Sequence, residues 1–319
     1  MIAFIRHVWT ALVLTTLALI AAVMVSASIL GPHSPRFDLA THLAPILASA
    51  TILMMLACAP LGRVARKWGL WGAALALAAS ISLIAPEYLR DIGPQAVPDE
   101  AGPIKIIQFN GYRYNHLTSE VVDWLIAEQP DIVTIQETHP DLRDEILRRT
   151  NWQIAGLPSG TLTIFSARPR LIMDRPPNTG RLHWVNATYP SASGPYELVT
   201  VHLDWPSSPY HAGQRAQLIE MIRTRPHDRL ILTGDFNSTP WSYGLREIDA
   251  KSGVTRRERG LFSYPAGGDA WDPISLPLPV LPIDHVYAGP GWATVSVRRG
   301  PRLGSDHYPV VMVLAPARR

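Results

Sequence analysis

Long uncharged apolar runs fill the first 86 residues of the chain. No Lys, Arg, Asp or Glu occurs in residues 8–30, 39–62 or 68–86, and the first of these runs is 23 residues long. A helix of that length rises about 35 Å at ~1.5 Å per residue, which is enough to cross the hydrocarbon of a bilayer. The pattern predicts three transmembrane helices at about these positions, which together form an anchor over residues 1–86.

Three other interpretations of these runs are weaker. A cleavable signal peptide has a shorter apolar region that ends at a small-residue cleavage site. Buried helices of a soluble protein rarely occur as three consecutive uncharged runs. A channel or transporter would carry ionisable side chains inside its spans, and the interiors of these runs contain no Lys, Arg, Asp or Glu.

The charges of the connecting loops predict the orientation of the anchor. Arg63, Arg66 and Lys67 lie between the second and third runs, whereas the loop with Arg36 and Asp38 is neutral. Because basic residues favour cytoplasmic loops, the chain after the third run is expected on the far side of the membrane. In a bacterium, the anchor would lie in the inner membrane and the rest of the chain in the periplasm.

A different pattern begins after residues 87–103, a segment with three prolines and two glycines that is predicted to be a linker. From residue 104 on, short β-rich apolar runs alternate with amphipathic stretches, which predicts an α/β domain over residues 104–319. The predicted strands lie at about 104–109, 131–135, 161–165, 198–203, 229–233, 283–288 and 309–314. The predicted helices lie at about 118–128, 140–149 and 211–224.

The charge balance of this domain does not select a substrate. Residues 101–319 hold 23 basic and 21 acidic residues, a net charge of +2 that is too small to indicate binding to a polyanion. The single cysteine, Cys58, lies in an apolar run, so no disulfide can form within the chain.

Polar side chains stand at the ends of the predicted strands, where residues from neighbouring strands can converge on one rim of a sheet. Taken singly, an Asn or Asp after a strand is a common turn former or helix cap, and a lone His is usually structural. Their joint occurrence, each next to an apolar strand, favours a functional site. The candidates are Asn110, Glu137, His202, Asp235, Asn237, Asp284, His285, Asp306 and His307.

Such a set suits the cleavage of phosphoesters. A hard cation such as Mg²⁺ is held by one or two carboxylates and keeps open positions for phosphate oxygens and water. A base must take a proton from the attacking water, and neutral donors such as Asn and His offset the charge that builds on the phosphoryl oxygens.

These motifs resemble those of the endonuclease/exonuclease/phosphatase superfamily. The residues that carry the resemblance are Phe109-Asn110, Gln136-Glu137, Val201-His202, Gly234-Asp235-Phe236-Asn237, Ile283-Asp284-His285 and Ser305-Asp306-His307. It covers about residues 104–314 and includes all the main motifs. His202 stands where abasic-site endonucleases have a tyrosine, so the chain is more similar to the deoxyribonuclease and sphingomyelinase branches.

The resemblance implies the fold and the metal. The expected fold is a four-layer α-β-β-α sandwich, in which two mainly antiparallel sheets are flanked by helices and the active site lies on the rim. Glu137 would be the principal ligand of Mg²⁺, with Asn110 and Asp306 nearby, and Mn²⁺ is the expected substitute for Mg²⁺.

The resemblance also implies catalytic roles. His307, paired with Asp284, would be the general base or the imidazole that contacts the phosphate. Asp235 would orient or deprotonate the attacking water, Asn237 would contact the scissile phosphate, and His202 would donate to a phosphoryl oxygen. Water would attack in line, without a covalent enzyme intermediate.

The sequence thus predicts a membrane-anchored, Mg²⁺-dependent phosphoester hydrolase, with nuclease the favoured sub-class. Its expected partners are the lipid bilayer and a phosphoester substrate, either nucleic acid or a lipid headgroup, and no protein partner can be inferred. One alternative is a phospholipid or sphingomyelin phosphodiesterase, or a phosphatase, of the same fold, which an exposed aromatic loop beside the cleft would favour. Another is an inactive binding protein that retains the fold, against which the complete set of motifs argues.

Two groups of residues near these motifs have simpler interpretations. Arg256, Arg257 and Arg259 are expected in a solvated loop, although they could contact phosphates. Trp205 and Trp241 follow His202 and Asn237 closely, so they are expected either to form walls of the cleft or to pack beneath its rim.

Overall fold

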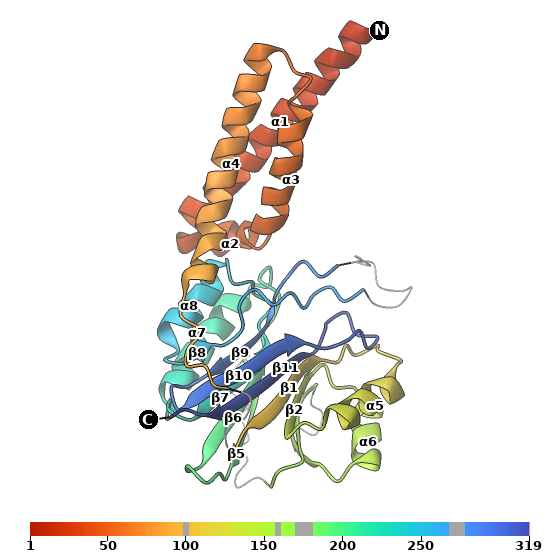
Figure 1. The fold of residues 1–319 in the computed structure, drawn as a ribbon, viewed down its shortest axis with the longest axis vertical. Coiled ribbons are helices and arrows are strands. Elements are labelled where there is room, and N and C mark those ends of the chain that lie inside the picture. The colour runs from red at the N-terminus through yellow and green to blue at the C-terminus, as the bar shows by residue number, and fades with distance from the viewer. Residues whose placement is uncertain (98–101, 157–160, 170–180, 268–277, 319) are drawn as a thin grey trace. The chain divides into compact units, whose positions relative to one another are not determined.

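The chain divides into two compact units (Figure 1). The N-terminal unit consists of Met1–Arg90 together with Thr239–Arg246, and the C-terminal unit of Asp91–Ser238 and Glu247–Arg319. The computed structural model describes residues 1–97, 102–156, 161–169, 181–267 and 278–318. The boundaries drawn from the sequence, 1–86, 87–103 and 104–319, stay a prediction.

The N-terminal unit contains the apolar helices. Its helices are α1 (Ile2–Leu30), the short 3-10 helix η1 (Gly31–His33), α2 (Pro35–Thr41), α3 (Ala44–Ala57) and α4 (Arg63–Leu89). By length and composition, the helical segment Ile2–His33 and α4 are both able to cross a membrane. The helices α2 and α3 are bent by 55° at their junction and make a third span only if the pair is counted as one.

The bend falls within the second predicted span, and Pro45 explains it. Proline lacks the N–H that a helix interior requires, and its ring clashes with the carbonyl group four residues earlier. The helix therefore stops at Thr41 and restarts at Ala44, with Pro45 in the first turn of α3, where proline is tolerated. The 14 residues of α3 rise only about 21 Å at ~1.5 Å per residue.

Thr239–Arg246 packs with these helices, although it follows a site motif in the sequence. The carboxylate of Asp38 accepts hydrogen bonds from the backbone N–H groups of Tyr243 (2.8 Å) and Gly244 (2.9 Å), in the first turn of α8 (Tyr243–Lys251). An anionic acceptor suits these N–H groups, because the first turn of a helix has no partners for them within the helix. The indole of Trp241 is fully buried and donates to the carbonyl of His42, so this side chain is not a wall of the cleft.

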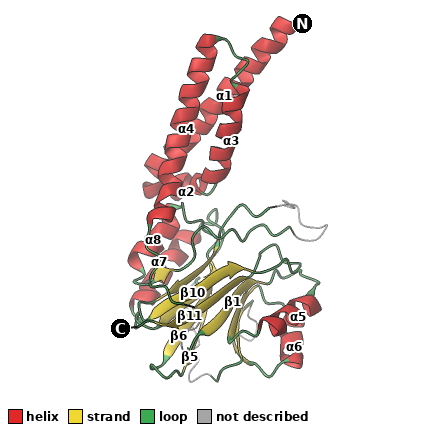
Figure 2. Ribbon diagram, in the orientation of Figure 1, coloured by secondary structure: helices red, strands yellow, loops and turns green. Residues whose placement is uncertain are grey.

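The C-terminal unit is built on two sheets (Figure 2). Strand order is β10-β11-β1-β2-β4-β3 in the first sheet and β5-β6-β7-β9-β8 in the second. Among the paired strands that the structure describes, β1 with β2 and β6 with β7 are parallel, and the other pairs are antiparallel. The strands are β1 (Ile104–Asn110), β2 (Ile132–Gln136), β3 (Gln153–Gly156), β4 (Leu162–Ser166), β5 (His183–Tyr189), β6 (Tyr196–His202), β7 (Leu230–Asp235), β8 (Thr255–Arg256), β9 (Asp284–Ala288), β10 (Trp292–Arg299) and β11 (Val310–Pro316).

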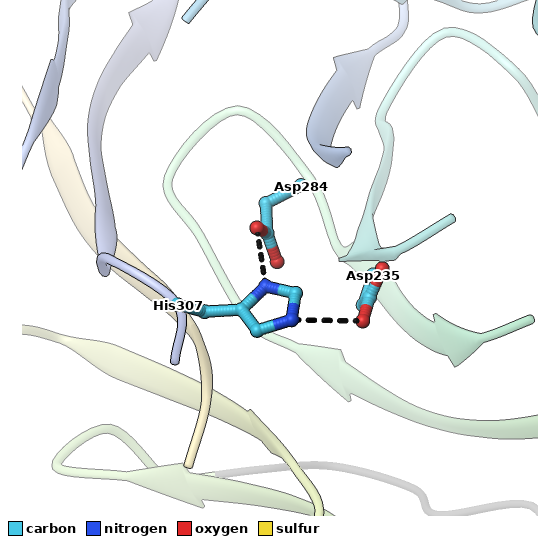
Figure 3. Close-up of side chains that lie close together, drawn as sticks. All are labelled: Asp235, Asp284 and His307. Atoms are coloured by element: carbon cyan, nitrogen blue, oxygen red, sulfur yellow. Dashed lines mark hydrogen bonds and ion pairs between the residues drawn. The ribbon is translucent and has the colours of Figure 1, made fainter. Parts of the chain in front are cut away.

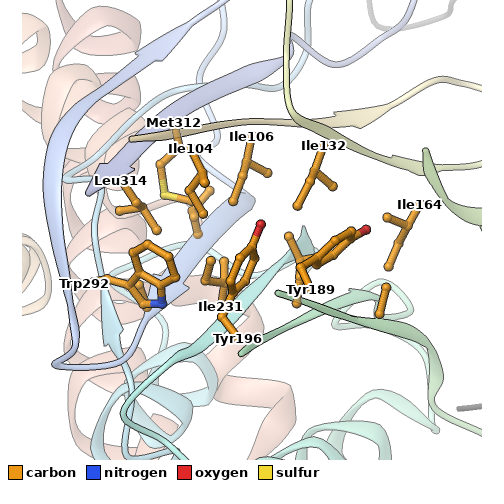
Figure 4. Close-up of a cluster of buried hydrophobic side chains, with 14 of the residues drawn as sticks. Ile104, Ile106, Ile132, Ile164, Tyr189, Tyr196, Ile231, Trp292, Met312 and Leu314 are labelled. Atoms are coloured by element: carbon orange, nitrogen blue, oxygen red, sulfur yellow. The ribbon is translucent and has the colours of Figure 1, made fainter. Parts of the chain in front are cut away.

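Alternation along the strands creates two apolar layers, since successive strand side chains point to opposite faces. Ile104 and Ile106 of β1 join residues of both sheets in the inner core (Figure 4). Ile107 and Phe109 of the same strand face outward and pack with α5 (Thr118–Glu128) and α6 (Pro140–Arg149). With α7 (His211–Arg223) outside the second sheet, the predicted four-layer α/β sandwich is confirmed.

Candidate active site

The inner faces of the strands change from apolar to polar toward one rim. In β1, Ile106 is followed by Gln108 and Asn110 on the same face, and in β7, Thr233 is followed by Asp235. Parallel pairing of β6 with β7 sets His202 beside Asp235, and antiparallel pairing of β7 with β9 sets Asp284 on the other side. The register of the second sheet thus gathers side chains from three strands at one place.

Asp235, Asp284 and His307 form a buried triad at the centre of this rim (Figure 3). His307 Nδ1 donates to Asp284 Oδ2 at 2.8 Å, and its Nε2 lies 3.7 Å from Asp235 Oδ2. The loop before β11 holds the ring in place, because the backbone N–H of His307 donates to Ser305 Oγ, which itself donates to the carbonyl of Asn110 at 2.6 Å. The imidazole is therefore fixed with Nε2 directed to Asp235.

Charges within the triad act on one another strongly, since little solvent reaches them. Burial would lower the pKa of His307, but the carboxylates of Asp284 and Asp235 raise it to about 10. Burial would raise the pKa of Asp284, yet the ion pair with His307 holds it below its ordinary value. Burial raises the pKa of Asp235, with a further contribution from Asp284. The Asp284–His307 pair is therefore the tighter of the two contacts.

Glu137 and Asn110 stand beside the triad. Asn110 Nδ2 donates to Asp235 Oδ2 at 3.0 Å and is 3.5 Å from Glu137 Oε1, so this amide lies between the two carboxylates. Glu137 follows β2 with a φ of +52°, a left-handed conformation that is uncommon for a residue with a Cβ. Its Oε2 accepts a hydrogen bond from the backbone N–H of Arg113 at 3.2 Å. An unusual backbone geometry thus directs this carboxylate into the site.

The carboxylates around the cleft repel one another in a way that a cation would relieve. Burial raises the pKa of Asp306, and the negative charges of Glu137 and Asp235 raise it further. Burial would also raise the pKa of Glu137, but His202 and the N–H of Arg113 lower it, so this carboxylate stays ionised. Hard oxygen donors of this kind are the ligands that Mg²⁺ prefers, so the residues present fit a divalent cation.

The buried triad could itself hold a metal ion, since single ligand atoms of its three residues lie within 4.8 Å of one another. Two of these residues, Asp284 and His307, already share a short hydrogen bond, however. We therefore favour Glu137 and Asp306, which line the open cleft, as the cation ligands.

A tight turn after β7 places Asn237. Gly234 has a φ of +153°, and a Cβ at this position would lie 2.1 Å from the carbonyl oxygen of Val201, so only glycine fits between β6 and β7. Asn237 also has a left-handed backbone, its N–H donates to Asp235 Oδ1 at 2.8 Å, and its Nδ2 donates to the carbonyl of Leu203. The turn thus holds the Asn237 amide at the edge of the site.

A cleft of about 520 Å³ opens over these residues. Asn110, Glu137, His202, Asp235, Asn237, Asp306 and His307 line it. Asp284 is buried and contacts His307, so the structure brings eight of the nine candidates together. The ninth, His285, is buried between Glu258 Oε1 (2.6 Å) and the carbonyl of Ser238 (2.7 Å) and does not line the cleft. Trp205 also lines it, as one of the two placements expected for this side chain, and so do Arg113, His183 and Asp204, which were not predicted as site residues.

A family model described as the Endonuclease/Exonuclease/phosphatase family matches residues 107–307, more than half of the chain. The chain belongs to the endonuclease/exonuclease/phosphatase family. It is a phosphoester hydrolase of this type, and the family generally depends on divalent metals. A second model, described as PUCC protein, matches residues 3–110, too small a share of the chain to assign it to that family.

Solved structures support the fold of this family member at low sequence identity. D. rerio TDP2 complexed with a single-strand DNA product is 17% identical with a TM-score of 0.55, and the match covers 67% of this chain and 99% of that one. An endonuclease/exonuclease/phosphatase from Bacteroides vulgatus is 16% identical with a TM-score of 0.54, covering 68% and 100%. The human Nocturnin catalytic domain is 14% identical with a TM-score of 0.53, covering 73% and 99%. Among curated proteins, none matches this chain.

A buried polar network behind the family motifs was missed in the sequence. Gln108 Nε2 donates to Asp284 Oδ1 at 2.9 Å and to Gln136 Oε1 at 2.7 Å, and Gln136 Nε2 donates to Thr200 Oγ1. These side chains link the two sheets directly beneath the rim. The available signal was a polar residue two positions before a site residue in an otherwise apolar strand, because residues i and i+2 share a face.

The arginines near β8 correct a sequence interpretation. Arg256 and Arg257 are only 2% exposed, so the expected solvated loop is wrong for both. Arg256 pairs with Asp249 at 2.9 Å and lies 3.6 Å from Glu258, while Arg257 donates to backbone carbonyls. A buried guanidinium requires such partners, and a polar stretch of sequence does not reveal them.

Replacing Gln108 by leucine is expected to lower kcat about 10- to 100-fold. The variant keeps the side-chain volume but removes the donor to Asp284, and a hydrogen bond to a charged group contributes about 1.5–3 kcal/mol. Thr134→Val is the matched control, because Thr134 bonds Thr233 in the same buried layer without contacting Asp284. Equal losses in both variants, measured as kcat at saturating substrate, would assign Gln108 to packing alone.

Proposed function

We propose that the chain is a membrane-anchored, Mg²⁺-dependent phosphodiesterase that cleaves nucleic acid by attack of an activated water. The observation that carries this proposal is the single cleft, in which the buried triad lies beside the carboxylates of Glu137 and Asp306. A base, cation ligands and neutral donors are all required for phosphodiester hydrolysis, and they face the same space.

Glu137, Asn110 and Asp306 would hold the Mg²⁺, with Mn²⁺ able to take its place. Their oxygen atoms match the preference of these cations, and the cleft is open enough for water and phosphate oxygens to join them. When bound, the cation would polarise the scissile phosphate and offset its charge.

The chain's own residues would then orient and deprotonate the water. Asp235 would hold the attacking water, because its Oδ2 lies at the junction of Asn110, His202 and His307. His307 Nε2, fixed through Asp284, would donate to a phosphate oxygen, and Asp235 would take the proton of the attacking water. Asn237 and His202, both on the cleft wall, would donate to the phosphoryl oxygens.

We also propose that the anchor lies in a bacterial inner membrane, with the cleft in the periplasm. Arg63, Arg66 and Lys67 all fall in the first turns of α4, and basic residues at the end of a span favour the cytoplasm. The chain that leaves the other end of α4 would therefore be extracytoplasmic.

A lipid phosphodiesterase is the second candidate. Trp205 lines the cleft and Tyr210 follows in the same loop, and each is 46% exposed. Exposed aromatic side chains beside a cleft are able to insert among lipid headgroups as well as to stack on bases.

The test is release of product by the full-length chain in detergent with Mg²⁺. The substrates are single- and double-stranded DNA, RNA, vesicles containing sphingomyelin or phosphatidylinositol phosphates, and inositol phosphates. We expect turnover of a nucleic acid and none of the lipids. Turnover of a lipid substrate alone would replace the nuclease proposal with the second candidate.

A further inference from the structure

The catalytic cleft continues into a second hollow of about 320 Å³. Arg113 and Thr161 line both spaces, so the two are neighbours across these side chains. Tyr114, His139 and Arg143 line only the second hollow, and no residue of the buried triad reaches it. A substrate that extends past the scissile bond on this side would enter it.

The His139 ring lines this hollow and carries a hydrogen-bond donor without a partner among the described residues. Its Nδ1 accepts from the backbone N–H of Leu142 at 3.4 Å, at the start of α6, which leaves the ring proton on Nε2. Nε2 is buried and has no hydrogen-bond partner among the residues that the structure describes. An N–H donor without a partner is a group that a ligand oxygen would satisfy.

Two arginines give the hollow a positive charge. Arg113 stands between both spaces, with its side chain 56% exposed and its Nε 3.5 Å from Glu137 Oε2. Among the residues that the structure describes, the Arg143 guanidinium pairs only with the adjacent and exposed Asp144 at 3.0 Å, a type of contact that contributes little. Neither Asp141 nor Asp144 lines the hollow. An anion in the hollow would therefore meet two guanidinium groups, with the His139 ring beside them.

An aromatic side chain stands next to these donors. Tyr114 is 62% exposed and contacts Tyr112 edge to face, with ring centroids 5.6 Å apart. This contact fixes the ring while leaving much of it open to solvent. An exposed ring beside phosphate-binding groups suits a nucleotide, because every base can stack on it. A headgroup without an aromatic ring would leave it unused.

We propose that Arg113, Tyr114, His139 and Arg143 form a flanking-phosphate site, which binds the phosphate next to the scissile one in an oligonucleotide, with a base against Tyr114. This inference rests on the proposed function, since a flanking phosphate exists only in a substrate with several phosphodiesters. The site would make the enzyme prefer oligonucleotides to diesters with a single phosphate.

The experiment compares two substrates with the full-length chain and Mg²⁺: a single-stranded DNA oligonucleotide and bis(p-nitrophenyl) phosphate, which has one phosphate. The measured ratio is kcat/KM for the oligonucleotide divided by kcat/KM for the small diester. For Arg143→Gln, we expect this ratio to fall about tenfold, which is the effect of losing one arginine–phosphate contact. Tyr114→Ala is expected to lower the same ratio. Arg148→Gln, an exposed arginine of the same helix paired with Glu145, is the matched control and keeps the ratio.

Each result distinguishes the two proposals. Turnover of the small diester supports the proposed function, and an unchanged ratio in both variants then overturns the flanking-phosphate site alone. If neither substrate is turned over, both the proposed function and the flanking-phosphate site are overturned. An Arg143-dependent preference for phosphatidylinositol bisphosphate vesicles over oligonucleotides would assign the hollow to a lipid headgroup and overturn the site as stated.

Discussion

Replacing His307 by alanine is expected to lower kcat about 10²- to 10⁴-fold, the contribution typical of a positioned acid or base. No other imidazole of the described site is held on one side by a buried carboxylate while its other nitrogen faces a second one. The loss should lie in kcat rather than in KM, because the ring acts at the reacting atoms and not along the substrate. Single-turnover hydrolysis at saturating Mg²⁺ measures this step directly.

The control is His116→Ala, since His116 is exposed and does not line the cleft. It should leave kcat unchanged. Asp284→Asn should reproduce a large part of the His307→Ala loss, because it removes the carboxylate that fixes Nδ1. A His307→Ala enzyme with nearly normal kcat would contradict the assigned role.

Replacing Glu137 by glutamine is expected to raise the Mg²⁺ concentration for half-maximal activity at least ~10- to 100-fold. Loss of a residue that only supports a metal ligand typically weakens metal binding by this factor. Loss of a ligand itself should weaken it at least as much. At saturating Mg²⁺, kcat should still be about 10³-fold lower, since the cation stabilises the transition state by several kcal/mol. The two side chains have the same shape, so the left-handed backbone of residue 137 is preserved. Titration of activity with Mg²⁺ gives both values.

Glu120→Gln is the matched control for charge, because Glu120 lies exposed in the first turn of α5. It should leave the Mg²⁺ requirement unchanged. If Glu137→Gln also left it unchanged while Asp284→Asn raised it, the cation would lie at the buried triad rather than at Glu137.

Sequence patterns identified the inner strands of both sheets and missed the edges. The seven predicted strands correspond to β1, β2, β4, β6, β7, β9 and β11. The four strands that were not predicted, β3, β5, β8 and β10, are the two edges of each sheet. An inner strand is covered on both faces and paired on both sides, so most of its residues are apolar. An edge strand such as β10, which ends in Ser-Val-Arg-Arg, is partly exposed and has no such run.

The site was predictable where a polar residue ends an apolar strand, and less so inside the strands. Asn110 and Asp235 are visible because they interrupt the hydrophobic pattern at its end. Gln108 and Thr200 are buried in mid-strand, and their importance depends on partners in other strands. Trp241 shows the same limit, since its packing in the N-terminal unit depends on contacts nearly 200 residues away in sequence.

The most direct test of the account is hydrolysis of a DNA oligonucleotide by the full-length chain, with and without Mg²⁺, beside the Glu137→Gln and His307→Ala variants. The account predicts turnover that requires the cation, is restored by adding Mg²⁺ after chelation, and is lost in both variants. Turnover that persists in the presence of chelator, or that both variants retain, would contradict it.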